Sequence, residues 1–189
     1  MSTRTSGSAD PRHVVVVGSM AVGKSTVGRA LAARLGRPFR DSDEDLEATR
    51  GVTGRELAQR EGVDALHRWE AKHLQAALAG TQPAVVAAAA SVVDDDASLA
   101  ALRAPFVVWL RAPAAILAQR IADGTWGDDH RRPLGDATAV AELEAHRAGR
   151  FDAVADLTID TVADGTTTSP DAIVATILAA LQPAAPGTP

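Results

Sequence analysis

The chain has 189 residues, 46% hydrophobic and 23% charged, which suits a globular protein with a single α/β domain. A net charge of −5 excludes the basic surface of nucleic-acid-binding proteins, and no apolar run reaches the roughly 18 residues of a membrane span. We therefore expect a protein that binds neither nucleic acid nor membrane. The lack of cysteine excludes disulfides and thiolate metal sites and fits a cytoplasmic protein.

The N-terminal region contains the most informative pattern of the chain. Residues 1–11 are polar, which predicts a disordered tail, and they lack the apolar core of a signal sequence, so we do not expect export. A β-branched run at 13–17 predicts a buried strand, and apolar spacing predicts a helix at 24–35. Between them, residues 18–26 read Gly-Ser-Met-Ala-Val-Gly-Lys-Ser-Thr and match the pattern G-x-x-x-x-G-K-[ST]. Strand, glycine-rich loop and helix together predict a phosphate-binding P-loop.

The chemistry of this loop assigns a role to several of its residues. Its backbone N–H groups and the N-terminus of the following helix form an anion site. Lys24 is expected to reach the β- and γ-phosphates of a nucleotide, and the Ser25 hydroxyl to bind Mg²⁺. Gly18 and Gly23 stand where a Cβ would obstruct the turn or the phosphate. The predicted nucleotide-binding residues of the loop are Gly18, Ala21, Val22, Gly23, Lys24, Ser25 and Thr26.

Helices alternate with short strands along the rest of the chain. Further strands are expected at 38–40, 83–90, 105–110 and 156–160, and further helices at 43–50, 54–61, 64–79, 96–102, 113–122, 137–151 and 170–181. This alternation predicts right-handed crossovers and a parallel sheet. We therefore predict one three-layer α/β/α domain over residues 12–182, with a five-stranded parallel sheet.

Two further segments lack the periodicity of a helix or strand. Residues 123–136 are polar and contain three glycines, and such a long loop in a compact domain predicts a mobile lid. Residues 183–189 are rich in proline and alanine, and we expect them to form a disordered C-terminal tail.

A pair of acids follows the second predicted strand. Asp41 and Asp43 should therefore lie at the carboxyl edge of the sheet, where such folds bind ligands. Asp41 is expected to hold Mg²⁺ through water, and Asp43 to orient an acceptor hydroxyl and accept its proton. The alternative is that the acidic run 41–45 only caps the first turn of a helix.

With the loop, the acidic pair and the lid in place, the chain resembles the shikimate kinases, which are small P-loop enzymes of the nucleoside-monophosphate-kinase fold. The resemblance runs from Val14 to Leu181. It rests on the loop GSMAVGKSTVGR, on Asp41-Ser-Asp43, on Leu66-His-Arg-Trp-Glu70 for the family's F-R-x-x-E, on Arg132-Pro-Leu134, on Arg147-Ala-Gly-Arg-Phe151 for R-x-x-x-Y, and on Pro170.

The resemblance implies transfer of the γ-phosphate of ATP to a hydroxyl of a small molecule, with ATP and Mg²⁺ as cofactors. Shikimate is the default acceptor, and the implied pathway is aromatic amino acid biosynthesis. The resemblance gives catalytic roles to Lys24, Asp43 and Arg132, the last as the lid cation, with Arg131 as its rival.

The resemblance also implies an adenine site. It places Arg120 and Pro170 beside the base, although Arg120 equally suits a helix C-terminus, where the dipole favours a cation.

The residues that the resemblance assigns to the acceptor site differ from the family pattern at several positions. Arg147 is expected to grip the acceptor's carboxylate, the alternative being an exposed arginine on a charged helix. His67 replaces a second family arginine and is a weaker, pH-dependent partner for a carboxylate. Ala88–Ala90 replace the family's G-G-G, and their methyl groups narrow the pocket. The predicted acceptor-binding residues are Asp43, His67, Ala88, Ala89, Ala90 and Arg147.

Two more acids have open roles. Glu70 is expected to be structural, as a partner of Arg147 or Arg68. Asp94 ends a hydrophobic run in the manner of a Walker-B carboxylate. Alternatively, the strand ends near Ala90 and the acids 94–96 cap the next helix, which the family resemblance favours.

Other functions remain open at the level of the sequence. The chain could phosphorylate a different polyol or hydroxy acid, such as a gluconate-like compound, or it could be a nucleotide kinase of the same fold. A third alternative is a nucleotide-binding module without kinase activity. The presence of the predicted lid cation Arg132 argues against that module, because binding alone does not need it. By analogy with kinases of this size, we expect a monomer.

Overall fold

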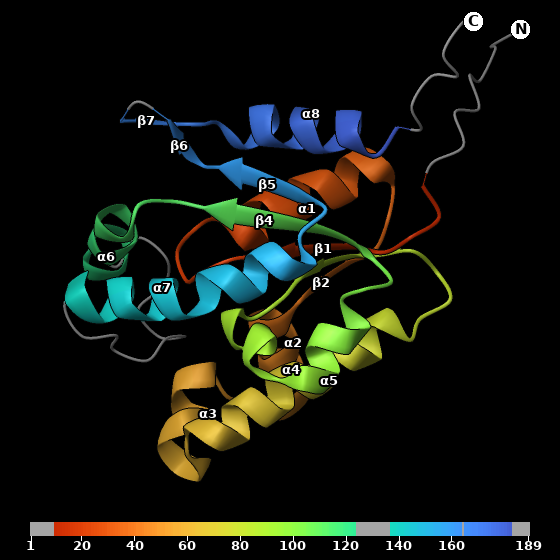
Figure 1. Cartoon of the computed structure of the whole chain (residues 1–189). Coiled ribbons are helices and arrows are strands. Elements are labelled where there is room, and N and C mark those ends of the chain that lie inside the picture. The colour runs from red at the N-terminus through yellow and green to blue at the C-terminus, as the bar shows by residue number, and fades with distance from the viewer. Residues whose placement is uncertain (1–9, 124–136, 164, 183–189) are drawn as a thin grey trace, which may run out of the picture.

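The computed structural model describes residues 10–123, 137–163 and 165–182, and its centre is a sheet of five parallel strands (Figure 1). The strands lie in the order β2-β3-β1-β4-β5. They are β1 Val14–Val17, β2 Phe39–Asp41, β3 Val85–Ala87, β4 Phe106–Arg111 and β5 Leu157–Asp160. The predicted α/β class and five-stranded parallel sheet are confirmed.

The strand order places a ligand site at the end of β1. Val15 of this strand pairs with Val86 of β3 on one side and with Val107 of β4 on the other. The chain therefore fills one half of the sheet before crossing to the other half, and β1 lies at the switch point. Ligands of open α/β sheets bind at the carboxyl ends of the strands at such a point.

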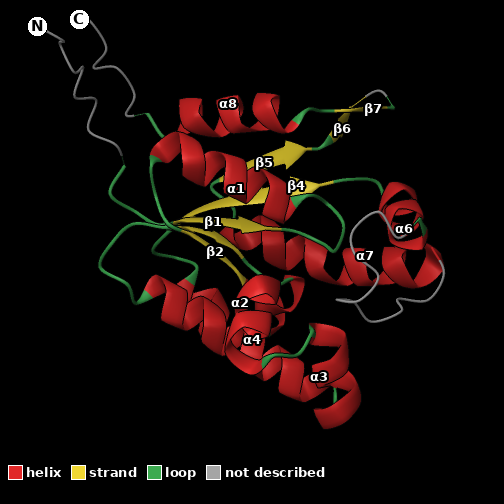
Figure 2. Cartoon of the chain, turned by 180° about the vertical axis from the view of Figure 1, so that it is seen from behind, coloured by secondary structure: helices red, strands yellow, loops and turns green. Residues whose placement is uncertain are grey.

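Helices cover both faces of the sheet, as Figures 1 and 2 show from opposite sides. The α-helices are α1 Lys24–Leu35, α2 Ser42–Arg50, α3 Gly54–Glu61, α4 Val63–Leu78, α5 Asp96–Ala101, α6 Ala114–Ala122, α7 Ala137–Val154 and α8 Pro170–Ala180, with a 3₁₀ helix η1 at Ala90–Asp94. Helices α1 and α8 lie on one face, and α4, α5 and α7 lie on the other. None of the described helices is long and apolar enough to cross a membrane.

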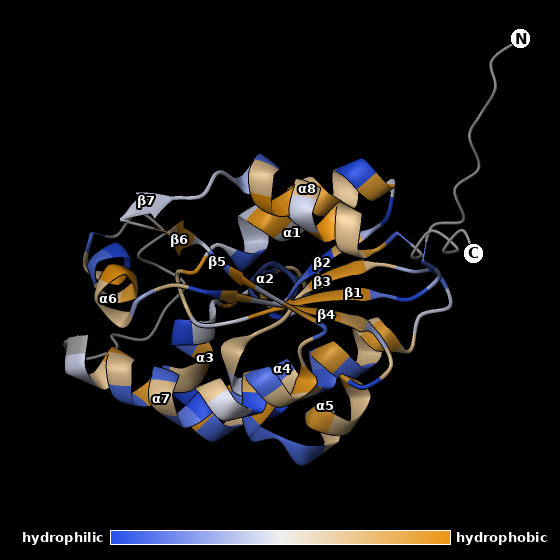
Figure 3. Cartoon of the chain, turned by 45° about the horizontal axis from the view of Figure 1, so that its top comes forward, coloured by the Kyte–Doolittle hydropathy of each residue, from blue (hydrophilic) through white to orange (hydrophobic). Residues whose placement is uncertain are grey.

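The central strand explains why this arrangement is stable. Its four valines are completely buried. Val14 and Val16 pack into the cluster that contains α1 and α8, whereas Val15 and Val17 pack into the cluster that contains α4, α5 and α7. A strand that is hydrophobic on both sides can only lie between two layers of helices. Figure 3 shows the apolar colour concentrated along β1, β3 and β4.

The structure corrects two details of the prediction. The expected strand 83–90 ends at Ala87, because its pairing with β1 stops at Val16, and the chain then turns into η1. A short antiparallel pair, β6 Val162–Ala163 and β7 Thr166–Thr167, was not predicted, since strands of two residues have no readable periodicity. The lid beyond residue 123, the tail residues 1–9 and residues 183–189 lie outside the described residues.

Candidate active site

The loop after β1 adopts a backbone that depends on glycine. Gly18 has φ +137° and Gly23 has φ +105°. A Cβ on Gly18 would collide with the carbonyl oxygen of Leu110 at the end of β4, so another residue there would be both strained and blocked. Ala21 has φ +61°, an uncommon value for a residue with a side chain, and such strain is concentrated at functional sites.

The start of α1 is arranged to receive an anion. Gly23 is the N-cap and offers no side-chain acceptor, and the first turn of the helix contains no acid. The first N–H groups of the helix are therefore left for a ligand, and the helix dipole favours negative charge there. Lys24 Nζ donates hydrogen bonds to the carbonyl oxygens of Gly18 at 3.0 Å and Ser19 at 2.9 Å, which holds the ammonium group over the loop.

Arg120 and Pro170 were predicted to lie beside the adenine base, and only Arg120 is seen to contact the phosphate loop. Arg120, at the end of α6, donates from Nη1 to the carbonyl oxygen of Ala21 at 3.2 Å and thus contacts the phosphate loop. Pro170 is the first residue of α8 and follows the N-cap Ser169. Their roles in binding a base stay predictions.

Asp41 has the capping role that the sequence offered as an alternative, while its role in holding Mg²⁺ stays a prediction. It ends β2 and caps α2, since its Oδ1 accepts a hydrogen bond from the backbone N–H of Asp43 at 3.0 Å. Its other oxygen, Oδ2, is buried and has no hydrogen-bond partner among the described residues. One oxygen therefore builds the helix terminus, and the second is left for a ligand such as a cation.

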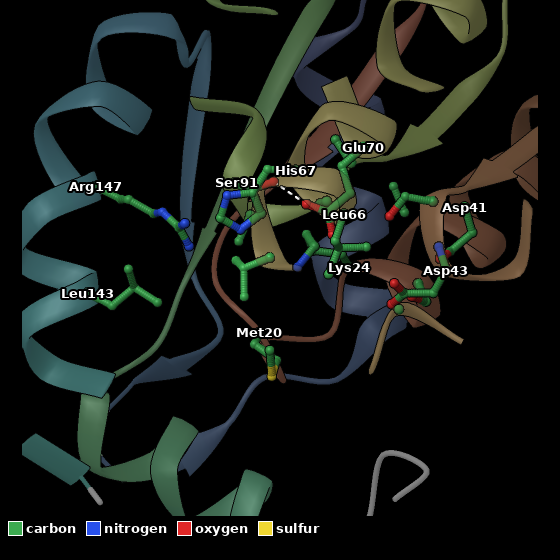
Figure 4. A pocket seen from close by; sticks show the side chains of 18 residues that line it. Met20, Lys24, Asp41, Asp43, Leu66, His67, Glu70, Ser91, Leu143 and Arg147 are labelled. Carbon is green, nitrogen blue, oxygen red and sulfur yellow. Dashed lines mark hydrogen bonds between the residues drawn. The ribbon is translucent and has the colours of Figure 1, made fainter. Parts of the chain in front are cut away.

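A cavity of about 230 Å³ joins the loop to the predicted acceptor residues. Figure 4 shows Lys24 and Met20 between Asp41 and Asp43 on one side and Leu143 and Arg147 on the other. The cavity is lined by Met20, Lys24, Ser25, Asp41, Ser42, Asp43, Gly54, Val63, Leu66, His67, Glu70, Ala87, Ala88, Ala89, Ala90, Ser91, Leu143 and Arg147. Every predicted acceptor-binding residue thus lies on the same cavity wall as Lys24 and Ser25.

Glu70 takes a partner that the sequence did not indicate. It forms no salt bridge with Arg68 or Arg147, and instead its carboxylate accepts a hydrogen bond from the hydroxyl of Ser91 (Figure 4). Burial raises the pKa of Glu70 to about 7, although the hydrogen bond from Ser91 opposes this rise. Near neutral pH, the cavity therefore contains a carboxyl group that can both donate and accept protons.

Arg147 is buried rather than exposed, so the alternative of a solvated arginine is wrong. Its Nε and Nη2 both donate to Oδ2 of Asp94, at 2.9 and 2.5 Å. Asp94 lies at the end of η1, well beyond the end of β3, and therefore does not occupy a Walker-B position. The cap of α5 is its neighbour Asp95, which accepts from the N–H of Ser98 at 2.7 Å.

A further acid near the site was missed. Glu144 lies one turn before Arg147 on α7, and one of its carboxylate oxygens is buried without a partner among the described residues. Burial raises its pKa, while the charges of Lys24 and Arg147 lower it. The spacing of three residues from Arg147 was the available signal, because such residues share a helix face. The two candidates for the lid cation, Arg131 and Arg132, lie outside the described residues.

Comparison with known proteins identifies relatives of this chain. Residues 20–182 match the family model described as shikimate kinase. The chain is 38% identical over 122 residues to the shikimate kinase of Symbiobacterium thermophilum, an alignment that covers 65% of this chain and 68% of that protein. It is 32% identical over 171 residues to shikimate kinase 2 of Serratia proteamaculans, covering 89% and 95%. The solved structure of the Acinetobacter baumannii shikimate kinase in complex with shikimate superimposes with a TM-score of 0.77 and 27% identity, covering 88% of this chain and 90% of that one.

Proposed function

The chain belongs to the shikimate kinase family, and we propose that it transfers the γ-phosphate of ATP to a hydroxyl group of shikimate. The observation that carries the proposal is that Lys24, Ser25, Asp43 and Arg147 all line the same cavity. A phosphate-binding loop, a carboxylate suited to a hydroxyl and a cation suited to a carboxylate are the parts that such a transfer needs.

The residues at the loop fit Mg·ATP. The uncapped start of α1 and the open space beside Gly23, where a Cβ would meet no atom within 4 Å, leave room for phosphate oxygens against the backbone. Ser25 and Asp41 line the same cavity, and Oδ2 of Asp41 has no hydrogen-bond partner among the described residues. These two side chains would supply the hard oxygen ligands that Mg²⁺ prefers. Kinases hold Mg²⁺ with one or two side chains together with phosphates and water, so a larger cluster of acids is not required.

The predicted catalytic residues and Arg147 then each have a defined task. Lys24 and the N–H groups of α1 bind the terminal phosphates, and bound Mg·ATP supplies the phosphoryl group and the metal charge that offsets its negative oxygens. Asp43 orients the acceptor hydroxyl and takes up its proton as the new P–O bond forms and the bond to ADP breaks. Arg147 binds the acceptor's carboxylate through N–H groups that do not donate to Asp94, and Arg132 stabilises the transferring group.

The proposal is tested by following ADP release with purified protein, Mg·ATP and separate acceptors. We expect turnover with shikimate, and little turnover with quinate, gluconate or nucleoside monophosphates. Lys24→Ala should lower kcat/KM by at least about a thousandfold, because it removes the charge that stabilises the transferring phosphate. The chain has one other lysine, the exposed Lys72 on α4, and Lys72→Ala is the matched control that should retain full activity.

Two outcomes would overturn the proposal. Turnover with gluconate but not shikimate would assign a different acceptor within the same chemistry. Tight nucleotide binding without turnover of any acceptor would identify a binding module. We also infer a cytoplasmic monomer, and light scattering coupled to size-exclusion chromatography tests the oligomeric state against the chain mass of 19.5 kDa.

A further inference from the structure

The cation that faces the acceptor cavity belongs to a cluster of three charges. Asp94 lies between two arginines of α7: its Oδ2 accepts from Arg147, and its Oδ1 lies 3.6 Å from Nη1 of Arg150. Arg150 also donates from Nη1 to the carbonyl oxygen of Val93 at 3.1 Å. The cluster thus connects α7 to the C-terminal end of η1, on the opposite side of the sheet from α1.

The geometry leaves one edge of the Arg147 guanidinium for a ligand. A guanidinium has two edges that can bind a carboxylate through a pair of N–H groups, one with Nε and Nη2 and one with Nη1 and Nη2. Asp94 occupies the first edge, since both Nε and Nη2 donate to its Oδ2. Among the described residues, nothing accepts a hydrogen bond from Nη1 of Arg147, while the side chain lines the cavity (Figure 4).

The charge of the cluster is not cancelled. Two arginines and one aspartate leave a net charge of +1, and the Arg150 side chain is 42% exposed whereas that of Arg147 is only 8% exposed. Water therefore screens Arg150 more than Arg147, and Arg147 keeps its attraction for an anion in the cavity. A buried arginine without any partner would be costly, so Asp94 also stabilises Arg147 in the absence of an acceptor.

From this geometry we propose that Asp94 is a positioning residue for the acceptor: it holds the guanidinium of Arg147 so that the Nη1–Nη2 edge faces the cavity and binds the acceptor's carboxylate. This inference rests on the proposed function for the identity of the acceptor. It gives the first acid of the run 94–96, which neither caps a helix nor ends a strand, a role in recognition. With His67 in place of a second arginine, Arg147 carries most of the binding of a carboxylate, and its orientation then determines acceptor affinity.

The inference makes a prediction about kinetics. Asp94→Ala should raise KM for shikimate about tenfold, because a displaced guanidinium loses paired hydrogen bonds to the carboxylate. It should change kcat and KM for ATP less than about twofold, since the effect is on acceptor binding rather than on phosphate transfer. Asp94→Asn retains an oxygen that can accept from Arg147, so it should raise KM for shikimate less than about threefold. Asp96→Ala removes the same charge from the exposed first turn of α5 and is the matched control, which should behave as wild type.

The sign of the change separates positioning from simple neutralisation. If Asp94 mainly cancelled the charge of Arg147, both substitutions would strengthen carboxylate binding and lower KM for shikimate. A lower or unchanged KM for shikimate in Asp94→Ala therefore overturns the inference. If the wild-type enzyme phosphorylates shikimate in the same assay, the proposed function still stands.

A second measurement needs neither acceptor nor turnover. Phenylglyoxal modifies accessible arginines, and peptide mass spectrometry measures the modification of Arg147 separately from that of Arg150. We expect Arg147 in Asp94→Ala to be modified several times faster than in wild type, because the side chain is released into the cavity, and Asp96→Ala to match wild type. Equal rates in wild type and Asp94→Ala overturn the positioning role. This result is independent of the proposed function, which instead fails if the wild-type enzyme shows no shikimate-dependent ADP release.

Discussion

At the scale of single residues, two ionisable side chains of the acceptor cavity, Glu70 and Arg147, are controlled by their neighbours. Glu70 lies in the cavity wall with a serine hydroxyl as its hydrogen-bond partner, and the charge of Asp43 nearby adds to the effect of burial on its pKa. Arg147 reaches the same cavity but is bound to Asp94. The cavity therefore combines a carboxyl group that titrates near neutrality with a cation whose direction is held by a neighbour.

The raised pKa of Glu70 predicts how stability changes with pH. The unfolded chain ionises this residue near its ordinary pKa of 4.5, whereas the folded protein ionises it near 7. Between these values the folded state binds more protons, so the free energy of unfolding falls as pH rises from about 4.5 to about 7. Below 4.5 the contribution is fully present, and above 7 it is lost; it amounts to at most about 3 kcal/mol.

Urea unfolding of wild type and Glu70→Gln at several pH values measures this contribution. The difference in unfolding free energy between the two proteins should change across pH 4.5–7, because the amide keeps an acceptor for Ser91 and does not ionise. Glu142→Gln, on the exposed surface of α7, is the control and should leave the wild-type pH profile unchanged. Parallel profiles for wild type and Glu70→Gln would contradict the raised pKa.

His67 gives a prediction about acceptor affinity. His67→Arg should lower KM for shikimate severalfold with little change in kcat. A second guanidinium in the cavity wall adds a permanent positive charge and can donate two hydrogen bonds to one carboxylate. Gln75→Arg adds the same charge at an exposed position of the same helix, and should have no effect on KM. If KM does not fall, the methyl groups of Ala88–Ala90 rather than His67 limit the pocket.

At the scale of elements, local signals in the sequence were sufficient for most of the fold. Each predicted helix and strand agrees with the structure within three residues, because β-branched runs, caps and glycines mark the boundaries clearly. The strand predicted at 83–90 was too long since Ala88–Ala90 continue its apolar pattern, and only the missing partner strand ends it. The pairing of Asp94 with Arg147 spans 53 residues of sequence and has no local signal at all.

The capping box of α3 makes a prediction about stability. Thr53 Oγ1 accepts from the N–H of Glu56 at 3.1 Å, and the Glu56 carboxylate accepts from the N–H of Thr53 at 2.9 Å. Thr53→Ala should therefore lower the free energy of unfolding by about 1 kcal/mol. The measurement is chemical denaturation, with Thr49→Ala in the exposed part of α2 as a control that should change stability by less than about 0.5 kcal/mol. Equal effects of the two substitutions would mean that the cap contributes nothing.

At the scale of the whole molecule, the sheet order explains why residues far apart in sequence share one cavity. The loop after β1, the acids after β2 and the alanines after β3 all leave the same edge of neighbouring strands. Parallel strands bring their carboxyl ends together, so this part of the site could be predicted from the alternation of strands and helices. The contribution of α7 could not be derived from that alternation, because the rotation of a helix about its axis depends on tertiary packing. The prediction of Arg147 as an acceptor residue rested on the family resemblance instead.

The strand order and the Asp94–Arg147 ion pair together have a consequence for redesigning this enzyme. Most of the acceptor wall comes from one continuous stretch, Asp41 to Ser91, so a foreign acceptor pocket could be introduced as a single exchanged segment. Arg147 lies outside that stretch, and its anchor Asp94 lies three residues beyond it. A chimera joined directly after residue 91 would take the pocket from one parent and leave the arginine and its anchor with the other. The position of the junction relative to residue 94 thus decides whether Arg147 and its anchor come from the same parent or from two different parents.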